Sequence, residues 1–149
     1  MERRRLTALE RAALSVAHRV CPPGEELPVV FASRWGEIGV TLRLMRQFHE
    51  EGEMSPAGFS NSVHNAMPGH FSLLTRNHAP YTAVAAGQQS REMGLLEAST
   101  YPGRVVFVYA EEETPEMYRA SGVFPDGRPA AFAEALLIDN SEGGEGAVR

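Results

Sequence analysis

Side chains able to do covalent chemistry are few in this 149-residue chain, because all 14 basic residues are arginines and the only cysteine is Cys21. Without lysine the chain has no Schiff-base lysine and no phosphate-binding loop ending in Gly-Lys. Two prolines follow Cys21 in a turn that ends a predicted helix, so no helix N-terminus activates its thiol, and we expect an unreactive side chain. A single thiol forms no internal disulfide, which favours a reducing, cytoplasmic location.

Five histidines are candidates for acid–base or metal chemistry. No two of them have the spacing of an HExxH zinc motif, so we expect no metal site. We expect His18 and His49 to lie on exposed helix faces. His64 stands among small and amide side chains in the segment SVHNAMPG. Two interpretations of it stay open, a ring packed against the backbone, which we favour, and a catalytic residue.

The segment AVAAGQQS, residues 83–90, has the pattern of a strand that bends sharply into a helix. A side chain at such a bend stands at a helix N-terminus, where free N–H groups and the helix dipole favour an anion. An acyl-transfer enzyme needs a thiol or a hydroxyl at this position. This chain has Gln88 there, whose amide is not a nucleophile.

An apolar stripe and an acidic run have both a functional and a structural interpretation. Phe59, Met67, Phe71 and Leu74 could line an acyl tunnel, but residues at such spacing more often form core, and we favour core. Glu111–Glu113 could supply paired carboxylates. Because the run follows a strand end, we expect it to face solvent.

Helices must position these side chains, and apolar residues at helical spacing predict where they lie. The first runs from Thr7, which has capping-box spacing to Glu10, to Val20 and ends at CPPG. The second spans residues 36–51. Its apolar residues on one side are Ile38, Leu42, Met45 and Phe48.

Two further helical regions follow. Ser55 and Pro56 are typical of a helix start, and the pattern continues to residue 77 with an interruption at Pro68-Gly69, which predicts two short helices with a kink or loop between them. The last helix is predicted from Gln88 to residue 99.

Short apolar runs bounded by turn residues predict strands. They lie at residues 27–33, 81–85, 104–110 and 131–139. We expect the first two to be buried, and a turn at residues 125–128 to precede the last. Strands that alternate with helices, followed by two strands without a clear helix between them, predict an α/β fold with a mostly parallel sheet and one antiparallel edge strand.

Length and charge limit the remaining possibilities. We expect one domain over residues 1–139 and a disordered Gly/Glu-rich tail at 140–149. No apolar run approaches the roughly 18 residues that span a bilayer, so we expect no membrane segment. A net charge of −5 and a pI near 5.5 argue against a nucleic-acid partner.

Residues 31–98 resemble the N-terminal half of a β-ketoacyl synthase, a member of the thiolase superfamily. They most resemble the short, chain-length-factor type proteins of aryl polyene and related pigment clusters. The motifs that carry the resemblance are SP..F..SVHNA..G, NHAP and AVAAG, and RVVFVYAEE and DGRPAAFAEALLID are similar to the last two strands of that half. The resemblance covers about residues 4–139. It implies a thiolase-like half with helices on both faces of the sheet, and with the family's first strand missing ahead of the first helix.

The resemblance also implies a function. Gln88 stands where the family has its acyl-accepting cysteine, and the family's two active-site histidines belong to a C-terminal half that we do not find in this sequence. It therefore implies a non-catalytic subunit without cofactors that pairs with a catalytic ketosynthase in fatty acid or polyketide biosynthesis. Pairing would use strand 81–85, in a heterodimer or a homodimer, and an acyl carrier protein is a further candidate partner.

The resemblance assigns candidate residues to the acyl tunnel and the subunit interface. These are Phe59, His64, Asn65, Met67, Phe71, Tyr81, Thr82, Ala83, Val84 and Gln88. Two alternatives to the chain-length-factor role stay open. One is a malonyl-carrier-protein decarboxylase that uses the Gln88 amide as a hydrogen-bond donor, and the other is a structural remnant without a partner.

Overall fold

The computed structural model describes residues 6–122 and 131–141. Its four strands form one sheet in the order β2-β1-β3-β4. The strands are β1 (Val29–Ala32), β2 (Tyr81–Val84), β3 (Arg104–Glu111) and β4 (Phe132–Asp139). β2 and β3 are parallel to β1, and β4 is antiparallel to β3. The predicted mostly parallel sheet with an antiparallel edge strand is confirmed.

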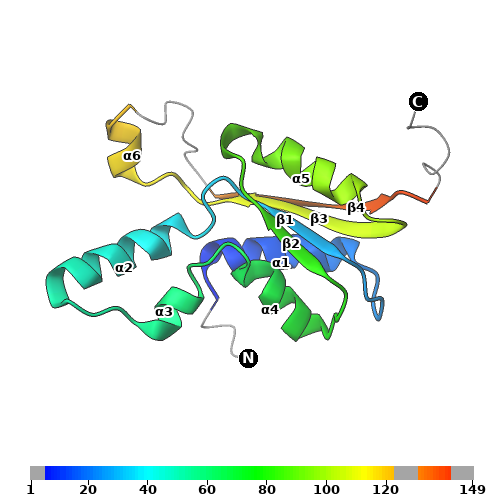
Figure 1. Cartoon of the computed structure of the whole chain (residues 1–149), viewed down its shortest axis with the longest axis horizontal. Coiled ribbons are helices and arrows are strands. Elements are labelled where there is room, and N and C mark those ends of the chain that lie inside the picture. The colour runs from blue at the N-terminus through cyan, green and yellow to red at the C-terminus, as the bar shows by residue number, and fades with distance from the viewer. Residues whose placement is uncertain (1–5, 123–130, 142–149) are drawn as a thin grey trace.

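Helices cover both faces of this sheet. α1 (Ala8–Val20) and α4 (Ala66–Thr75) lie on one face, and α5 (Ser90–Ser99) lies on the other (Figure 1). α2 (Ile38–Glu51) and α3 (Pro56–Ser60) extend beyond the end of the sheet, and so does α6 (Glu116–Ala120). α6 lies between β3 and β4, where the sequence predicted no clear helix. None of the described helices is long and apolar enough to cross a membrane.

The core has two layers, one on each side of the sheet, because β1 and β3 are central strands buried on both faces. The α1 and α4 layer contains Leu9, Ala13, Ala17, Val29, Phe31, Met67, Phe71, Val106, Val108 and Ala110. The α5 layer contains Val30, Ala32, Ala98, Val105, Phe107 and Tyr109. Gly94 lets α5 approach the sheet, since a Cβ there would lie 2.6 Å from the Ala32 Cβ and 2.8 Å from the Phe107 ring. The continuous apolar runs of these two strands thus reflect burial on both faces.

β2 differs from its prediction as a buried strand. It is an edge strand, with Tyr81 exposed and its other three residues half-buried. Its small and apolar residues look like those of a central strand, but nothing in the local sequence states which strand lies outermost.

The helix break predicted at Pro68-Gly69 lies elsewhere. α3 ends at Ser60, α4 begins at Ala66, and Pro68 lies within the first turn of α4. Proline is tolerated there because an N–H in the first turn has no partner within the helix. The two short helices themselves are confirmed, as is Ser55, whose side chain accepts a hydrogen bond from Gly58 N.

α2 buries a different side from the one that its spacing suggested. Val40 and Leu44 are buried, whereas Met45 and Phe48 are exposed. α3 covers the helix at Leu44, whose Cδ2 would lie 2.9 Å from a Cβ at Gly58. Because α2 extends past the sheet, only this narrow stripe is covered.

Two predictions fall partly or wholly outside the described residues. The turn at 125–128 is one of them. Of the expected tail, Asn140 still donates hydrogen bonds to the carbonyls of Ala98 and Tyr101, at 3.0 and 2.9 Å. Residues 142–149 are not described.

Candidate functional site at the carboxyl ends of the parallel strands

The carboxyl ends of β1, β2 and β3 lie at the same end of the sheet, which is where open α/β sheets bind their ligands. The carboxyl ends of β1 and β2 are linked by a backbone hydrogen bond, in which Ser33 N donates to the Val84 carbonyl at 3.1 Å. The bend before α5, the loop after β1 and the acidic run after β3 therefore meet there. The residues that follow neighbouring parallel strands thus lie close together although they are far apart in the sequence.

The bend after β2 has the predicted geometry. Gly87 has a φ of +60°, and a 3-10 turn, η2 (Gly87–Gln89), leads into α5. The hydroxyl of Ser90 fixes the bend, because it donates to the Gly87 carbonyl at 2.7 Å and accepts from Ala86 N at 2.9 Å. Gln88 is exposed at this point. Its amide can donate and accept hydrogen bonds but cannot form an acyl-enzyme.

His64 is packed against the backbone of the loop after β1. Its Nε2 lies 2.7 Å from the Ser33 carbonyl oxygen, and because a carbonyl only accepts, Nε2 is the donor. The ring lies so close to Gly36 that a Cβ there would be 2.8 Å from Nδ1. These contacts confirm the favoured interpretation of His64. His18 and His49 are exposed, as expected.

Glu111 is buried, so the expectation that the acidic run faces solvent is wrong for this residue. Its carboxylate accepts hydrogen bonds from the Ser33 hydroxyl, at 3.1 Å, and from Arg34 N. Ser33 in turn accepts from Gly36 N at 2.8 Å. The reason is topological, because Glu111 ends β3 directly beside the exit of β1, where backbone donors leave the sheet without strand partners.

A second polar cluster, made of three carboxylates and one hydroxyl and called the joint here, connects the starts of α1 and α2. It consists of Thr7, Glu10, Glu37 and Glu112. The Thr7 hydroxyl donates to Glu37 Oε1 at 2.6 Å, and Gly39 N in the first turn of α2 donates to Glu112 at 2.7 Å. The predicted capping box is confirmed, with both Thr7–Glu10 hydrogen bonds present.

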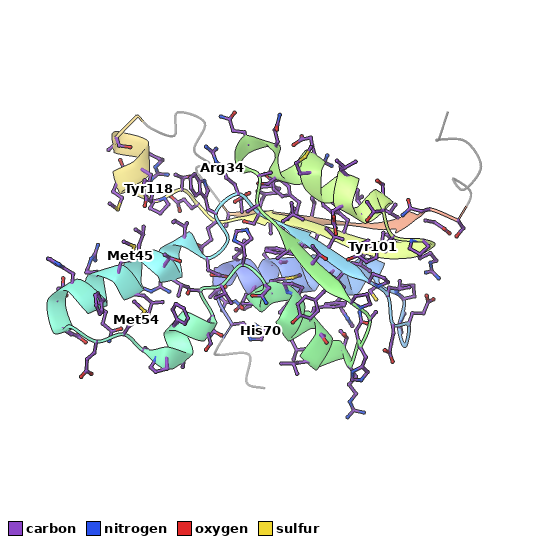
Figure 2. The ribbon with its side chains drawn as sticks, viewed as in Figure 1. Arg34, Met45, Met54, His70, Tyr101 and Tyr118 are labelled. Atoms are coloured by element: carbon purple, nitrogen blue, oxygen red, sulfur yellow. The ribbon has the colours of Figure 1, made fainter. Side chains whose placement is uncertain are left out.

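Glu10 does more in the joint than cap α1. It is fully buried, and its Oε1 lies 2.7 Å from Nδ1 of His70 on α4 (Figure 2). The same carboxylate therefore links α1 to α4 while it caps the helix.

Burial displaces the pKa of Glu37, one of the three carboxylates of the joint. Burial raises its pKa from 4.5 to about 7, with Glu112 and Glu10 adding to the rise and the Thr7 hydrogen bond and Arg43 opposing it. Its Oε2 has no hydrogen-bond partner among the described residues. Sequence reasoning missed the role of Glu37, whose only local signal is its position just before α2.

An aromatic stack closes the same end of the molecule. The Arg34 guanidinium lies 4.9 Å above the centre of the Trp35 ring, and Trp35 stacks on Tyr118 of α6 with ring centres 6.4 Å apart (Figure 2). The stack joins the loop after β1 to α6 through cation–π and ring contacts.

The structure divides the predicted tunnel stripe. Met67 and Phe71 are buried in the core, as favoured, but Phe59 and Leu74 are 57% and 48% exposed, so the core interpretation is wrong for these two. Asn65 is exposed and precedes α4 without a side-chain capping bond. A ligand that contacts these candidate tunnel residues would therefore touch Phe59, Asn65 and Leu74, which are exposed.

The predicted interface residues follow the alternation of strand β2. Thr82 points to the α5 side, where its hydroxyl lies 2.9 Å from the Tyr101 hydroxyl, and Ala83 packs on the α1 and α4 side. Val84 packs on the α5 side. The outer edge of β2 pairs with no described strand.

Cys21 lies at the opposite end of the sheet from Gln88. It follows α1 next to Arg104, the first residue of β3, which donates to Glu25 at 2.7 Å. Burial raises the pKa of the half-buried Cys21 thiol, with Glu25 adding to the rise and Arg104 opposing it, so the unreactive interpretation is supported. Within the described ranges, no three His, Cys, Asp or Glu side chains could together hold a metal ion.

Comparison with known proteins agrees with this geometry. The family model for the N-terminal domain of β-ketoacyl synthases matches residues 1–148. The fold is similar to a chain in the solved structure of a ketosynthase (ApeO) in complex with its chain length factor (ApeC) from Xenorhabdus doucetiae, with 28% identity and a TM-score of 0.80. The match covers 91% of this chain and 58% of that chain, so the sequence spans little more than half of the matched chain's length. No curated protein sequence matches. The chain belongs to the β-ketoacyl synthase N-terminal domain family.

Proposed function

We propose that this chain is a non-catalytic, ketosynthase-like subunit of the chain-length-factor type, which pairs with a catalytic ketosynthase in fatty acid or polyketide biosynthesis of the aryl polyene kind. One observation carries the proposal. Gln88 occupies the bend before α5, and the only thiol, that of Cys21, lies at the other end of the sheet. Acyl transfer through an enzyme needs a nucleophile at the reacting carbonyl, so the chemistry would belong to a partner.

The edge of β2 supports pairing through residues 81–85. The carbonyls of Pro80 and Val84 accept from Val29 N and Ser33 N of the β1 side, both at 3.1 Å. By strand alternation, the N–H and C=O groups of Tyr81 and Ala83 point away from β1, toward the open edge of the sheet. An unpaired edge of this kind is a template for a strand of another subunit. The similar solved structure is itself a complex of a ketosynthase with its chain length factor.

Among the residues assigned to the acyl tunnel and the interface, where a side chain could limit product length, the exposed ones are the useful test positions. Phe59 reaches solvent from α3, whereas Met67 and Phe71 belong to the core of this chain. Substitution of Phe59 therefore changes a candidate tunnel or interface side chain without removing core packing.

The test is co-expression with a cysteine-bearing ketosynthase encoded nearby, followed by size-exclusion chromatography and mass spectrometry of the products. We expect a stable heterodimer, loss of that complex in Ala83→Pro, which removes an outward-pointing N–H, and a changed product length in Phe59→Ala. Ala57→Pro in the first turn of α3 is the matched proline control, which we expect to leave the complex intact. A chain that stays monomeric and leaves the products unchanged would contradict the proposal.

The exposed amide of Gln88 at the start of α5 favours one second candidate, a malonyl-carrier-protein decarboxylase. Carbon dioxide release from malonyl carrier protein that is lost in Gln88→Ala would support it. The same assay supplies the test for an acyl carrier protein as a partner. A gene deletion without effect on pigment or lipid would instead favour a structural remnant.

A further inference from the structure

A groove of about 710 Å³ lies between α1 and α4, the two helices on the face of the sheet opposite α5. The proposed function does not use this groove. Its apolar surface comes from Leu6 just before α1, from Leu14 of α1, and from Phe71 and Leu74 of α4. The lining side chains recur at intervals of three or four residues along each helix, so each helix contributes one continuous stripe. The groove is thus a cleft between two helix faces.

The charged side chains that line this groove are all basic. Among the described lining residues they are Arg11 and Arg19 of α1, and the imidazole of His18 lies on the same helix between them. The one acidic residue of α1, Glu10, is fully buried and hydrogen-bonded to His70, and α4 contains no acidic residue. No described carboxylate forms an ion pair with the three basic side chains. A chain with a net charge of −5 therefore presents a basic, apolar cleft on this face.

We propose that this groove binds an amphipathic helix of a partner protein that carries acidic side chains beside an apolar stripe. The stretch from Arg11 to Arg19 is about 12 Å long at the rise of an α-helix, which corresponds to two turns of a bound helix. A third helix fits a cleft between two helices through its apolar stripe, and the basic rim then meets the acidic flanks. Exposed Leu73, which does not line the cleft, adds apolar surface next to Leu74 on α4.

The shape favours a helix over other anionic partners. A membrane surface is contacted by apolar side chains that protrude. Leu73 and Leu74 are exposed here, but Phe71 in the groove lining is fully buried, so the apolar surface between α1 and α4 is recessed. A nucleic acid would gain nothing from the apolar floor, because its affinity comes from phosphate contacts.

The test is a titration of the isotope-labelled full chain followed by nuclear magnetic resonance. The probe is a capped helical peptide of about 14 residues with Leu at i, i+3, i+4 and i+7 and Glu on both flanks, and its matched control has Lys in place of Glu. We expect shifts confined to α1 and α4 with the Glu peptide alone. The double variant Arg11→Glu with Arg19→Glu should weaken binding about tenfold or more, while Arg46→Glu, an exposed arginine of α2, should not.

Several results would overturn this inference. They are equal binding of the Lys peptide, shifts centred outside α1 and α4, or binding that charge reversal leaves unchanged. Attachment to phosphatidylglycerol vesicles without binding of the Glu peptide would assign the surface to a membrane instead. Leu74→Ala, at a half-exposed position, should weaken binding while leaving the circular dichroism spectrum unchanged. No ketosynthase is present in this experiment, so its failure would leave the proposed function untouched.

Discussion

Two regions of the molecule differ in how far they bury their large apolar side chains. The body consists of the sheet with α1, α4 and α5, and the arm consists of α2 and α3. In the body, Phe71 is 1% exposed, whereas Phe48 and Phe59 of the arm are each 57% exposed. Met45 lies on the same arm, and Met54 lies between its two helices (Figure 2). The body has a two-layered core and leaves some leucines such as Leu73 exposed. The arm buries only a narrow stripe and leaves both of its phenylalanines exposed.

The arm is attached to the body mainly through polar contacts. Thr7 at the start of α1 holds Glu37, and Glu112 after β3 holds the first turn of α2 through Gly39 N. We therefore expect substitutions in the body to lower the free energy of unfolding strongly and substitutions in the arm to lower it little. The carboxylates of the joint should make stability depend on pH. Each of the following tests can break or sharpen this contrast.

The largest effect should come from Phe71→Ala. Removal of a fully buried aromatic ring leaves a cavity, so we expect a loss of about 3–5 kcal/mol in the free energy of unfolding. Phe48→Ala on the exposed face of α2 is the matched control and should change stability by no more than about 0.5 kcal/mol. Urea denaturation measures both. Equal losses would mean that the arm also forms part of the core, and the contrast between the regions would fail.

Gly94→Ala should have the next largest effect. The new Cβ would lie 2.6 Å from the Ala32 Cβ and 2.8 Å from Phe107, so α5 must move away from the sheet. We expect a loss of about 3 kcal/mol, at the upper end of overpacking costs. Thermal melts measure this loss. Met93→Ala, at a neighbouring exposed position of α5, is the control and should be close to neutral. A neutral Gly94→Ala would show that α5 is only loosely packed on the sheet.

Glu37 should make stability depend on pH. Because its pKa is about 7 in the folded state against 4.5 ordinarily, the folded chain keeps a proton that the unfolded chain releases between these values. Its contribution is therefore full below pH 4.5 and is lost as the pH rises through 7, by about 3 kcal/mol. Glu37→Gln should flatten this part of the curve and stabilise the protein at pH 8, whereas Glu53→Gln in an exposed loop should not. A curve that Glu37→Gln leaves unchanged would remove the joint as a pH-sensitive element.

The smallest effect should come from Ser55→Ala in the arm. The lost hydrogen bond to Gly58 N, 3.1 Å long, caps only the five-residue helix α3, so we expect about 1 kcal/mol or less and a local effect. Native-state hydrogen exchange should become faster at Phe59 N and Asn61 N and stay unchanged in β3. Faster exchange throughout the sheet would mean that the arm and the body unfold as one unit.

Much of the fold could be predicted because local patterns report burial and capping. The uninterrupted apolar run of β1 predicted a buried strand, that of β3 predicted a strand, and the caps Thr7 and Ser55 marked two helix starts. Pro68 misled the prediction because a proline looks the same in a helix break and in a first helical turn. The local pattern missed the edge position of β2 because strand order is not a local property, although the family resemblance had implied that strand 81–85 is a pairing edge.

The candidate site was only half predictable. Gln88 could be placed at the bend from the sequence, because small residues between a strand and a helix define such a bend by themselves. Glu111 could not be recognised as buried, because its partners Ser33 and Arg34 are distant in sequence and meet it only where the parallel strands end together.

The sequence by itself determined which segments form the four strands and all the longer helices, though not α6. It also determined that no thiol or hydroxyl stands at the position where a strand of this family bends into its helix. These properties depend on periodicity and residue type along the chain. The tertiary structure alone decided that Glu37 and Glu111 are buried, that Phe59 is exposed, and that the basic residues of α1 face a cleft beside α4. The burial of a polar group and the covering of an apolar one depend on which segments meet, and local patterns do not contain that information.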